Sequence, residues 1–464
     1  MTSFPGGRGG ARDDVRALTL GLVVWVVAAV VWWPSVASFG DEVGYLGEAR
    51  IVLEGRLAPA AGDVGIWLPG AGRPVSKYPL LPSVLLAPLL AAWPKSVFAL
   101  GIAAAIVTSL LAARVLRSWG RDPTWALLVV AHPSIVILAR TAMTDVPLCA
   151  LALATWWAFR RGRLVLTVVL CAALCALKVT GGIVAGALLG GELLRRLPEL
   201  RRREPEAVRA LVAALVGLAG GTALVVVGNE LTTGTPWFAY EHGAVRPFSP
   251  AHFGATAPAQ LLNVLVIPPL LVLGAVPFWR RRELGPLALI CGFGGLMCFY
   301  FFVDHGRSRL ETLILAPRLL LPVVVFLLIG YADLLAALTR RLAGGPVLRV
   351  LLVAASTAAA VAIGVVHARW QRPASAALAA AERIAHEVAS DTLGVMPEAD
   401  KAAIVFRGRI QRFDRDRAPA VVVLCSDHPS SYRATASATA VVSCELPGYR
   451  PRFNDGGFSV LVRD

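Results

Sequence analysis

The stretch YPLLPSVLLAPLLAAWP, residues 78–94, decides how the rest of this chain is threaded. It is apolar, but it is shorter than the roughly 20 residues that a helix needs to cross a hydrocarbon core of about 30 Å. Three prolines, Pro79, Pro82 and Pro88, interrupt it, and proline lacks the backbone N–H that a helix interior requires. We therefore predict that it does not cross the membrane and forms a juxtamembrane or re-entrant helix pair.

Around this stretch lie eleven apolar runs that are predicted to span a membrane. They are residues 17–37, 97–116, 124–141, 146–160, 164–178, 179–194, 208–228, 260–279, 285–303, 316–337 and 347–367. Only 16% of the chain is charged and 56% is hydrophobic, whereas a soluble domain carries about 25% charged residues. A water-soluble enzyme is excluded, and the predicted fold class is an α-helical polytopic membrane protein with about eleven transmembrane helices.

The net charge of +15 comes mainly from arginine clusters between these runs. If residues 78–94 do not cross, all the clusters fall on one side, and short basic loops lie in the cytoplasm. This predicts a cytoplasmic N-terminal tail at 1–16, an outer loop at 38–96 and an extracytoplasmic C-terminal region. Clusters that set topology do not indicate a nucleic-acid partner, so none is expected.

Residues 368–464 follow the predicted membrane domain (17–367) and have a different pattern. A helical segment, 374–390, precedes the strand-like runs AAIVF, AVVVLC, TAVVSC and FSVLV, which turn residues separate. We predict a small extracytoplasmic α+β domain. Cys425 and Cys444 lie in polar sequence and can pair if this region faces an oxidising compartment.

Acidic residues occupy two of the predicted outer loops. Asp41 and Glu42 follow the first span, and Asp145 lies between the third and fourth. Capping of a helix N-terminus is one explanation for these acids, and a general base or metal-binding pair at a cavity mouth is the other. Lys77 accompanies the first site and Arg140 the second, and converging carboxylates and cations can bind phosphate and hydroxyl groups.

Further basic residues lie near the outer ends of predicted spans. Lys178 ends an apolar helix and Arg318 begins a late one. Such residues mark functional sites in membranes, unless the side chain only reaches for the interface. Three more charges, Arg307, Arg309 and Glu311, make residues 304–315 either a second anion site or a solvated loop.

Motifs that are missing from the sequence also restrict the function. There is no phosphate-binding G-x-x-x-x-G-K-[ST], no H-E-x-x-H and no G-x-S-x-G. The predicted spans contain almost no acidic residue, whereas ion-coupled transporters place carboxylates near the bilayer midplane. Any chemistry is therefore expected at the outer surface.

Five segments, in this order, resemble the GT-C membrane glycosyltransferases, in the branch with the protein O-mannosyltransferases and the bacterial lipid A aminoarabinose transferase. They are GDEVGYLGEARIVLEGR (40–56), KYPLLP (77–82), ARTAMTDVPL (139–148), ALKVTGG (176–182) and APRLLLP (316–322). The interruption at 78–94 is also a feature of this family. The resemblance covers residues 17–340.

The resemblance implies transfer of a sugar from a polyprenyl-phosphate donor to an acceptor hydroxyl, with inversion, on the outer face of a bacterial inner membrane. Asp41 matches the catalytic base, Glu42 its acidic neighbour, and Asp145 the acid that positions the acceptor or a metal. These three acids are the candidate ligands for a divalent cation, Mg²⁺ or Mn²⁺. The residues expected to bind the donor phosphate are Lys77, Arg140, Lys178 and Arg318.

Two departures from the family pattern affect the phosphate-binding residues. Tyr78 follows Lys77 where the family has proline, and Leu319 follows Arg318 where it has an aromatic residue. The acceptor is left open among a lipid, a glycan and a protein. Two alternative functions are a carrier or flippase for lipid-linked sugars, without bond chemistry, and a membrane scaffold with an interaction domain.

Overall fold

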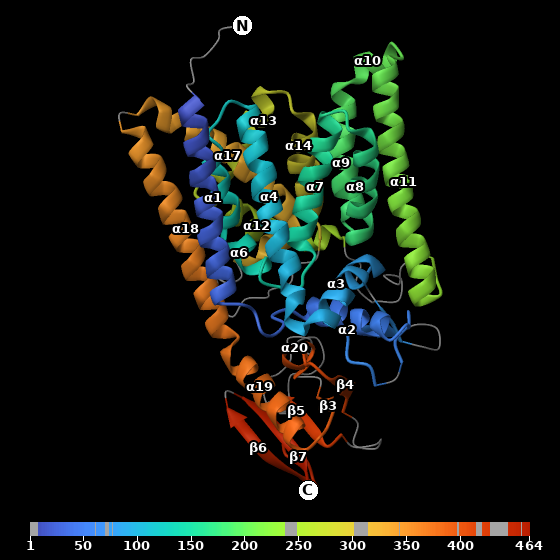
Figure 1. Cartoon of the computed structure of the whole chain (residues 1–464). Helices are drawn as coiled ribbons and strands as arrows, with labels where there is room; N and C mark the ends of the chain where they lie inside the picture. Colours follow the sequence, from blue (N-terminus) through green and yellow to red (C-terminus); the bar gives the residue numbers. More distant parts are fainter. Residues whose placement is uncertain are drawn as a thin grey trace.

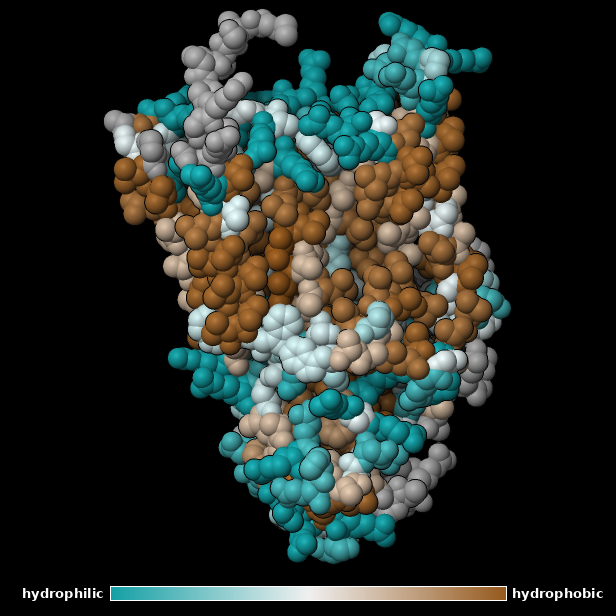
Figure 2. Space-filling view, in the orientation of Figure 1, coloured by the Kyte–Doolittle hydropathy of each residue, from teal (hydrophilic) through white to brown (hydrophobic). Residues whose placement is uncertain are grey.

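The structure is a computed structural model that describes residues 8–60, 62–69, 74–76, 78–236, 248–300, 314–342, 344–396, 399–413, 420–426, 444–455 and 457–464. A helix bundle carries a small sheet at one end, and the N-terminal helix begins at the other (Figure 1). An apolar band covers the visible face of the bundle between two polar ends (Figure 2). This distribution is that of an integral membrane protein.

Four helices among the described residues are long and apolar enough to cross a membrane. They contain α4 (Ala99–Ser118), α11 (Pro205–Thr233), α17 (Leu321–Arg341) and α18 (Gly345–Trp370), which match four of the predicted spans. Apolar side chains of α18 are exposed, with Val347 at 64% and Leu351 at 60%. Such a face requires lipid or another apolar partner around it. Other helices complete the bundle, among them α1 (Arg8–Val31), α7 (Asp145–Arg160) and α10 (Leu197–Arg201).

The apolar run 164–194 forms two helices, as predicted. They are α8 (Leu164–Leu177) and α9 (Gly181–Arg195), on either side of Lys178. Two glycines of α11 allow it to pack closely on α8, because a Cβ on Gly217 or Gly221 would lie 2.8 or 2.5 Å from the Cβ of Cys171 or Cys175.

The predicted span at 124–141 is not one helix. It consists of η2 (Pro123–Ala126), α5 (Leu127–Ala131) and α6 (Pro133–Leu138). The break falls at His132, whose ψ of 129° is extended. A residue that precedes proline avoids the helical region because of the clash with the proline ring, and Pro133 therefore divides a run that hydropathy alone treats as continuous.

Two later predicted spans also differ from straight helices. The run 260–279 forms α12 (Phe253–Val266), η5 (Leu271–Gly274) and α13 (Ala275–Arg280), with a bend of 77° at Pro268 and Pro269. The run 285–303 forms α14 (Leu284–Ala288), η6 (Leu289–Phe293) and α15 (Gly294–Met297), so the helix ends before the predicted boundary.

The stretch that decides the threading forms one helix, α3 (Leu80–Ala92), followed by η1 (Pro94–Phe98), and not the predicted pair. Pro79 is the N-cap residue and Pro82 lies in the first turn, where a missing N–H costs little. The helix packs against α2 (Gly40–Leu53), and both lie at the end of the bundle that faces the sheet (Figure 1). A hairpin of β1 (Trp67–Pro69) and β2 (Pro74–Ser76) precedes α3.

The C-terminal region contains α19 (Arg372–Glu387) and a five-stranded sheet of order β4-β3-β5-β7-β6. Strand β3 (Thr392–Val395) is parallel to β4 (Arg409–Arg412) and β5 (Val422–Ser426), whereas β7 (Phe458–Arg463) is antiparallel to β5 and β6 (Tyr449–Asp455). Two predicted strands correspond to β5 and β7. The run 402–406 is not a strand, because it belongs to α20 (Asp400–Ala403) and the turn after it.

The other C-terminal predictions have mixed outcomes. Residues 439–443 of the predicted strand TAVVSC lie outside the described residues. Cys425 and Cys444 form a disulfide. Arg50 of α2 holds this region against the bundle, since its Nε and Nη1 donate to the carbonyls of Ile404 and Gly408 at 3.1 and 3.0 Å.

Candidate active site

Asp41 lies in the first turn of α2, where the positive end of the helix dipole favours an anion. Phe39, not Asp41, is the N-cap residue. Each oxygen of the Asp41 carboxylate has a donor from a distant part of the chain. The Tyr78 hydroxyl donates to Oδ1 at 2.6 Å, and Nη2 of Arg318 donates to Oδ2 at 2.8 Å.

Glu42 performs the capping that the sequence also allowed for Asp41. Its Oε2 accepts the backbone N–H groups of Ser38 and Phe39 at 2.7 and 2.8 Å, and its Oε1 accepts that of Ala142 at 2.7 Å. The side chain thus binds the N–H of the N-cap residue, which is the glutamate half of a capping box, and joins α2 to the segment before α7. Burial raises the pKa of Glu42 to about 7, although the three N–H donors oppose that rise. Because both carboxylate oxygens of Glu42 bind backbone N–H groups, Asp41 and Asp145 are the two acids left for a functional role at this site.

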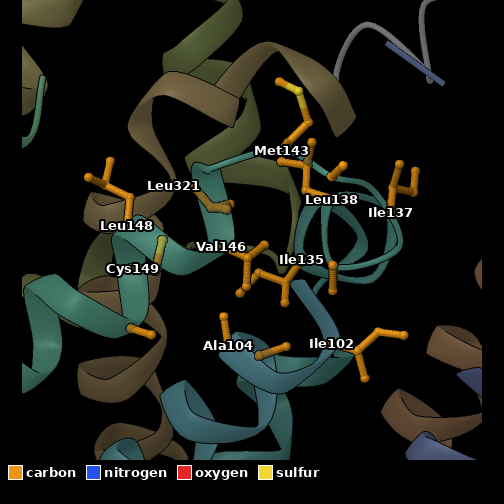
Figure 3. Close-up of a cluster of buried hydrophobic side chains, with 14 of the residues drawn as sticks. Ile102, Ala104, Ile135, Ile137, Leu138, Met143, Val146, Leu148, Cys149 and Leu321 are labelled. Carbon is orange, nitrogen blue, oxygen red and sulfur yellow. The ribbon is translucent and has the colours of Figure 1, made fainter. Parts of the chain in front are cut away.

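Asp145 is the first residue of α7 and is fully buried. Nζ of Lys178 contacts Oδ1 at 2.6 Å, and Oδ2 accepts no hydrogen bond from any described residue. The next residues in α7 anchor it in the bundle: Val146 and Cys149 lie among apolar side chains that include Ile135 and Leu138 of α6 (Figure 3). Capping does not account for Asp145, because α7 has no side-chain cap bond.

Tyr45 connects the two acids. Its hydroxyl lies 3.1 Å from Oγ1 of Thr144, the neighbour of Asp145, and its ring lies 4.4 Å from that of Tyr78 between centroids. Burial raises the pKa of Tyr45, and the nearby charges of Asp41 and Asp145 raise it further. We call this group the outer cluster, after the side of the membrane on which the sequence predicts it to lie, and it consists of Asp41, Tyr45, Tyr78, Asp145, Lys178 and Arg318.

Two predicted phosphate-binding residues do not appear among these contacts. Arg140 is 2% exposed and donates to the carbonyl of Trp32, so its observed role is to hold the end of α1. Lys77 lies outside the described residues, as does the candidate anion site of Arg307, Arg309 and Glu311. The structure therefore joins Asp41, Asp145, Lys178 and Arg318 from the sequence prediction.

The three predicted metal ligands have different partners in the structure. Among the described residues, no group of three or more His, Cys, Asp or Glu side chains is arranged to hold a metal ion. Both Asp41 oxygens already have cationic or phenolic donors, and Glu42 accepts backbone N–H groups. Among the described residues, Asp41, Glu42 and Asp145 therefore do not converge as the predicted three-carboxylate metal site.

Sequence reasoning missed both tyrosines of the outer cluster. One feature of the sequence set Tyr78 apart, because it stands where the resembled family has proline. Nothing in the sequence indicated that its hydroxyl reaches Asp41. Tyr45 follows Asp41 by one helical turn, the spacing that places two side chains on one face of a helix.

Comparisons with known proteins show the fold. No protein-family model matches this sequence, and no curated protein matches it in a sequence search. Among solved structures, ArnT from Cupriavidus metallidurans bound to undecaprenyl phosphate is similar, with 16% identity, a TM-score of 0.58, and 96% of this chain and 97% of that chain covered. Apo ArnT matches over the same shares, with 16% identity and a TM-score of 0.56. This chain therefore has the ArnT fold over nearly its whole length.

Proposed function

We propose that this protein is a membrane glycosyltransferase that takes a sugar from a polyprenyl-phosphate donor and transfers it to an acceptor hydroxyl. The observation that carries this proposal is the outer cluster, in which two acids that are remote in sequence lie beside two cations at one end of the bundle. The ArnT fold adds support, because ArnT has been crystallised with undecaprenyl phosphate. We place the reaction in a bacterial inner membrane, on the side that carries the C-terminal sheet.

Asp41 is the proposed general base. Arg318 and Tyr78 stabilise its ionised form, and a carboxylate offers about four lone-pair positions, so an acceptor hydroxyl can still bind it. As the acceptor oxygen bonds to the anomeric carbon, its proton passes to Asp41, and the bond from that carbon to the phosphate oxygen breaks on the opposite face. This geometry inverts the anomeric carbon, and a positioned base contributes about 10²- to 10⁴-fold in rate.

The leaving group is a polyprenyl monophosphate, whose growing negative charge requires preorganised cations. Arg318 uses Nη2 for Asp41 and has other N–H donors for phosphate oxygens. Lys178 uses its ammonium group for Asp145 and likewise has further N–H donors. Both side chains are 14% exposed, so the proposed site has limited access to water, which strengthens such contacts.

Asp145 is proposed to position the acceptor. Its Oδ2 is buried and has no hydrogen-bond donor in the part of the chain that the structure describes, and a buried unpaired carboxylate oxygen is costly unless a ligand supplies a donor. A hydroxyl of the acceptor supplies such a donor. A lipid, a glycan or a protein can each carry it, and no step in this proposal passes through a metal ion.

The test uses the full chain in proteoliposomes with radiolabelled undecaprenyl-phosphate pentoses and hexoses, and bacterial lipid, glycan and protein fractions as acceptors. Wild type is expected to move label to one fraction. Asp41→Asn should lower transfer by about 10²- to 10⁴-fold and still bind undecaprenyl phosphate. Asp63→Asn is the matched control, because Asp63 is an acid of the same outer loop that pairs with Arg56 at 2.9 Å.

Two results would count against the proposal. Full transfer by Asp41→Asn removes this carboxylate from the reaction. Movement of labelled lipid between the two leaflets, without any labelled product, favours the carrier or flippase instead.

A further inference from the structure

Tyr78 combines a buried ring with a hydrogen bond from its hydroxyl to the carboxylate of Asp41. Its ring is buried, at 7% exposure, and its hydroxyl donates to Oδ1 of Asp41 at 2.6 Å. Arg318 approaches the other oxygen of the same carboxylate. Two donors from separate segments, one on each oxygen, restrict rotation of the carboxylate about its bond to Cβ. The carboxylate plane of Asp41 is therefore set by Tyr78 and Arg318 together.

The tyrosine ring is itself held in place. It lies directly on the Cα of Gly44, since a Cβ at that position would come within 2.0 Å of the ring atom Cε2. Tyr45 contacts the ring from one side, with an angle of 49° between the ring planes. Gly44 follows Asp41 by three residues in α2, so the base and the seat for the ring lie on one helix face.

We propose that Tyr78 is a positioning residue that orients the carboxylate of Asp41 toward the acceptor hydroxyl, and that Gly44 exists to admit its ring. This inference rests on the proposed function, because it assigns the means by which the proposed base is aimed. Tyr78 does not transfer the proton in this proposal, since its hydroxyl already donates to Asp41. Other charged groups of the outer cluster, Arg318, Asp145 and Lys178, are unchanged by the test variants.

The first test separates kcat from KM. Tyr78→Phe keeps the ring and removes the hydroxyl, and it should lower kcat by about 10- to 100-fold, the range for losing a hydrogen bond to a charged group. KM for the donor should stay within about twofold, because Tyr78 does not touch the phosphate in this proposal. Gly44→Ala keeps the hydroxyl but displaces the ring, and it should lower kcat in the same direction.

The matched control is Tyr449→Phe. The Tyr449 hydroxyl donates to the carbonyl of Ala420 at 2.7 Å in the C-terminal sheet region, far along the chain from the cluster. This variant should leave kcat unchanged. Equal kcat values for Tyr78→Phe and wild type would overturn the proposal, and so would equal losses in Tyr78→Phe and Tyr449→Phe.

A second test does not depend on transfer. Thermal unfolding in detergent is measured for wild type, Tyr78→Phe, Asp41→Asn and the double variant, and the cycle isolates the coupling between the two side chains. Tyr78→Phe should lower Tm in the wild type but much less in the Asp41→Asn background. Equal shifts in both backgrounds would refute the contact and the proposal with it. Absence of transfer by wild type, together with clear coupling, would instead overturn the proposed function.

Discussion

Two groups of buried and partly buried charges lie along one helical segment, and they differ in how completely their acids are paired. Arg318 begins the segment at the outer cluster, and Asp333 follows it by 15 residues, or about 22 Å at the rise of an α-helix. Oδ1 of Asp333 accepts hydrogen bonds from Arg121 and Arg281, and Oδ2 accepts one from Arg281. Arg281 also lies over the ring of Trp119 at 4.3 Å. We call Asp333, Arg121, Arg281 and Trp119 the inner cluster.

The acid of the inner cluster is paired on both oxygens, whereas, within the described part of the chain, one acid of the outer cluster is paired on only one. Every oxygen of Asp333 has an arginine donor, but Oδ2 of Asp145 has no donor among the described residues. Asp41 is also 21% exposed at its side chain, compared with 6% for Asp333. The differences in pairing and in exposure separate a structural ion network from a candidate site.

Exchanging each acid for its amide should give the largest difference between the two clusters. Asp145→Asn should lower transfer by about 10²- to 10³-fold, because it removes charge and an acceptor atom from the proposed site. Asp333→Asn should instead lower the free energy of unfolding by about 3 kcal/mol, since two partly buried arginines lose their carboxylate, with normal transfer per folded molecule. Radiolabel transfer normalised to folded protein, together with thermal unfolding, measures both. Loss of transfer in both variants would contradict the distinction.

Exchanging arginine for lysine should also distinguish the two clusters, with a smaller effect on transfer. Arg318→Lys retains the charge but loses the planar fork that can contact Asp41 and a phosphate at once, so transfer should fall about tenfold with a higher KM for the donor. Arg281→Lys, the counterpart in the inner cluster, should leave KM unchanged. Donor titrations in proteoliposomes give both constants. An unchanged KM in Arg318→Lys would remove this residue from phosphate binding.

The smallest expected effect concerns the pH dependence of stability at the outer end. Burial raises the pKa of Glu48 from 4.5 to about 7, so the folded state binds the proton more tightly than the unfolded state does. The free energy of unfolding should therefore fall as pH rises from below the unfolded value through the folded one, by about 1 kcal/mol between about pH 6 and about pH 8. Glu48→Gln should remove its own share of this fall and leave the share of Glu42, whose pKa burial likewise raises to about 7, whereas the exposed Glu54→Gln should retain both shares. Unfolding at several pH values measures the slope, and an unchanged slope in Glu48→Gln would contradict the assignment.

The membrane class and several helices could be read from the sequence because hydropathy adds up along the chain. The two helices on either side of Lys178 were predicted for this reason, and the structure confirms them. Hydropathy wrongly predicted one continuous helix at residues 124–141 and another at residues 260–279. Proline blocks a backbone hydrogen bond without making the segment less apolar, so a broken helix and a straight one have nearly the same hydropathy.

The candidate site was predictable as a set of residue types but not as a set of contacts. Sequence position alone made Asp41 and Glu42 equivalent neighbours, whereas the structure directs one toward Arg318 and the other toward three backbone N–H groups. Which of two adjacent side chains faces a site depends on the rotation of α2 against its neighbours. That rotation is set by packing with α3 and the segment before α7.

The amino-acid sequence by itself determined that the chain is a membrane protein, that its short loops are basic, and that acids follow particular helices, because each of these depends on residues close together in the chain. The contact between Asp41 and Arg318, 277 residues later, and the packing of Tyr78 on Gly44 depend on the fold. So does the oxygen of Asp145 that lacks a donor among the described residues. Electrostatic and hydrogen-bond energies depend on distances of a few ångströms between remote segments, and helix crossings, which local pattern does not specify, set those distances.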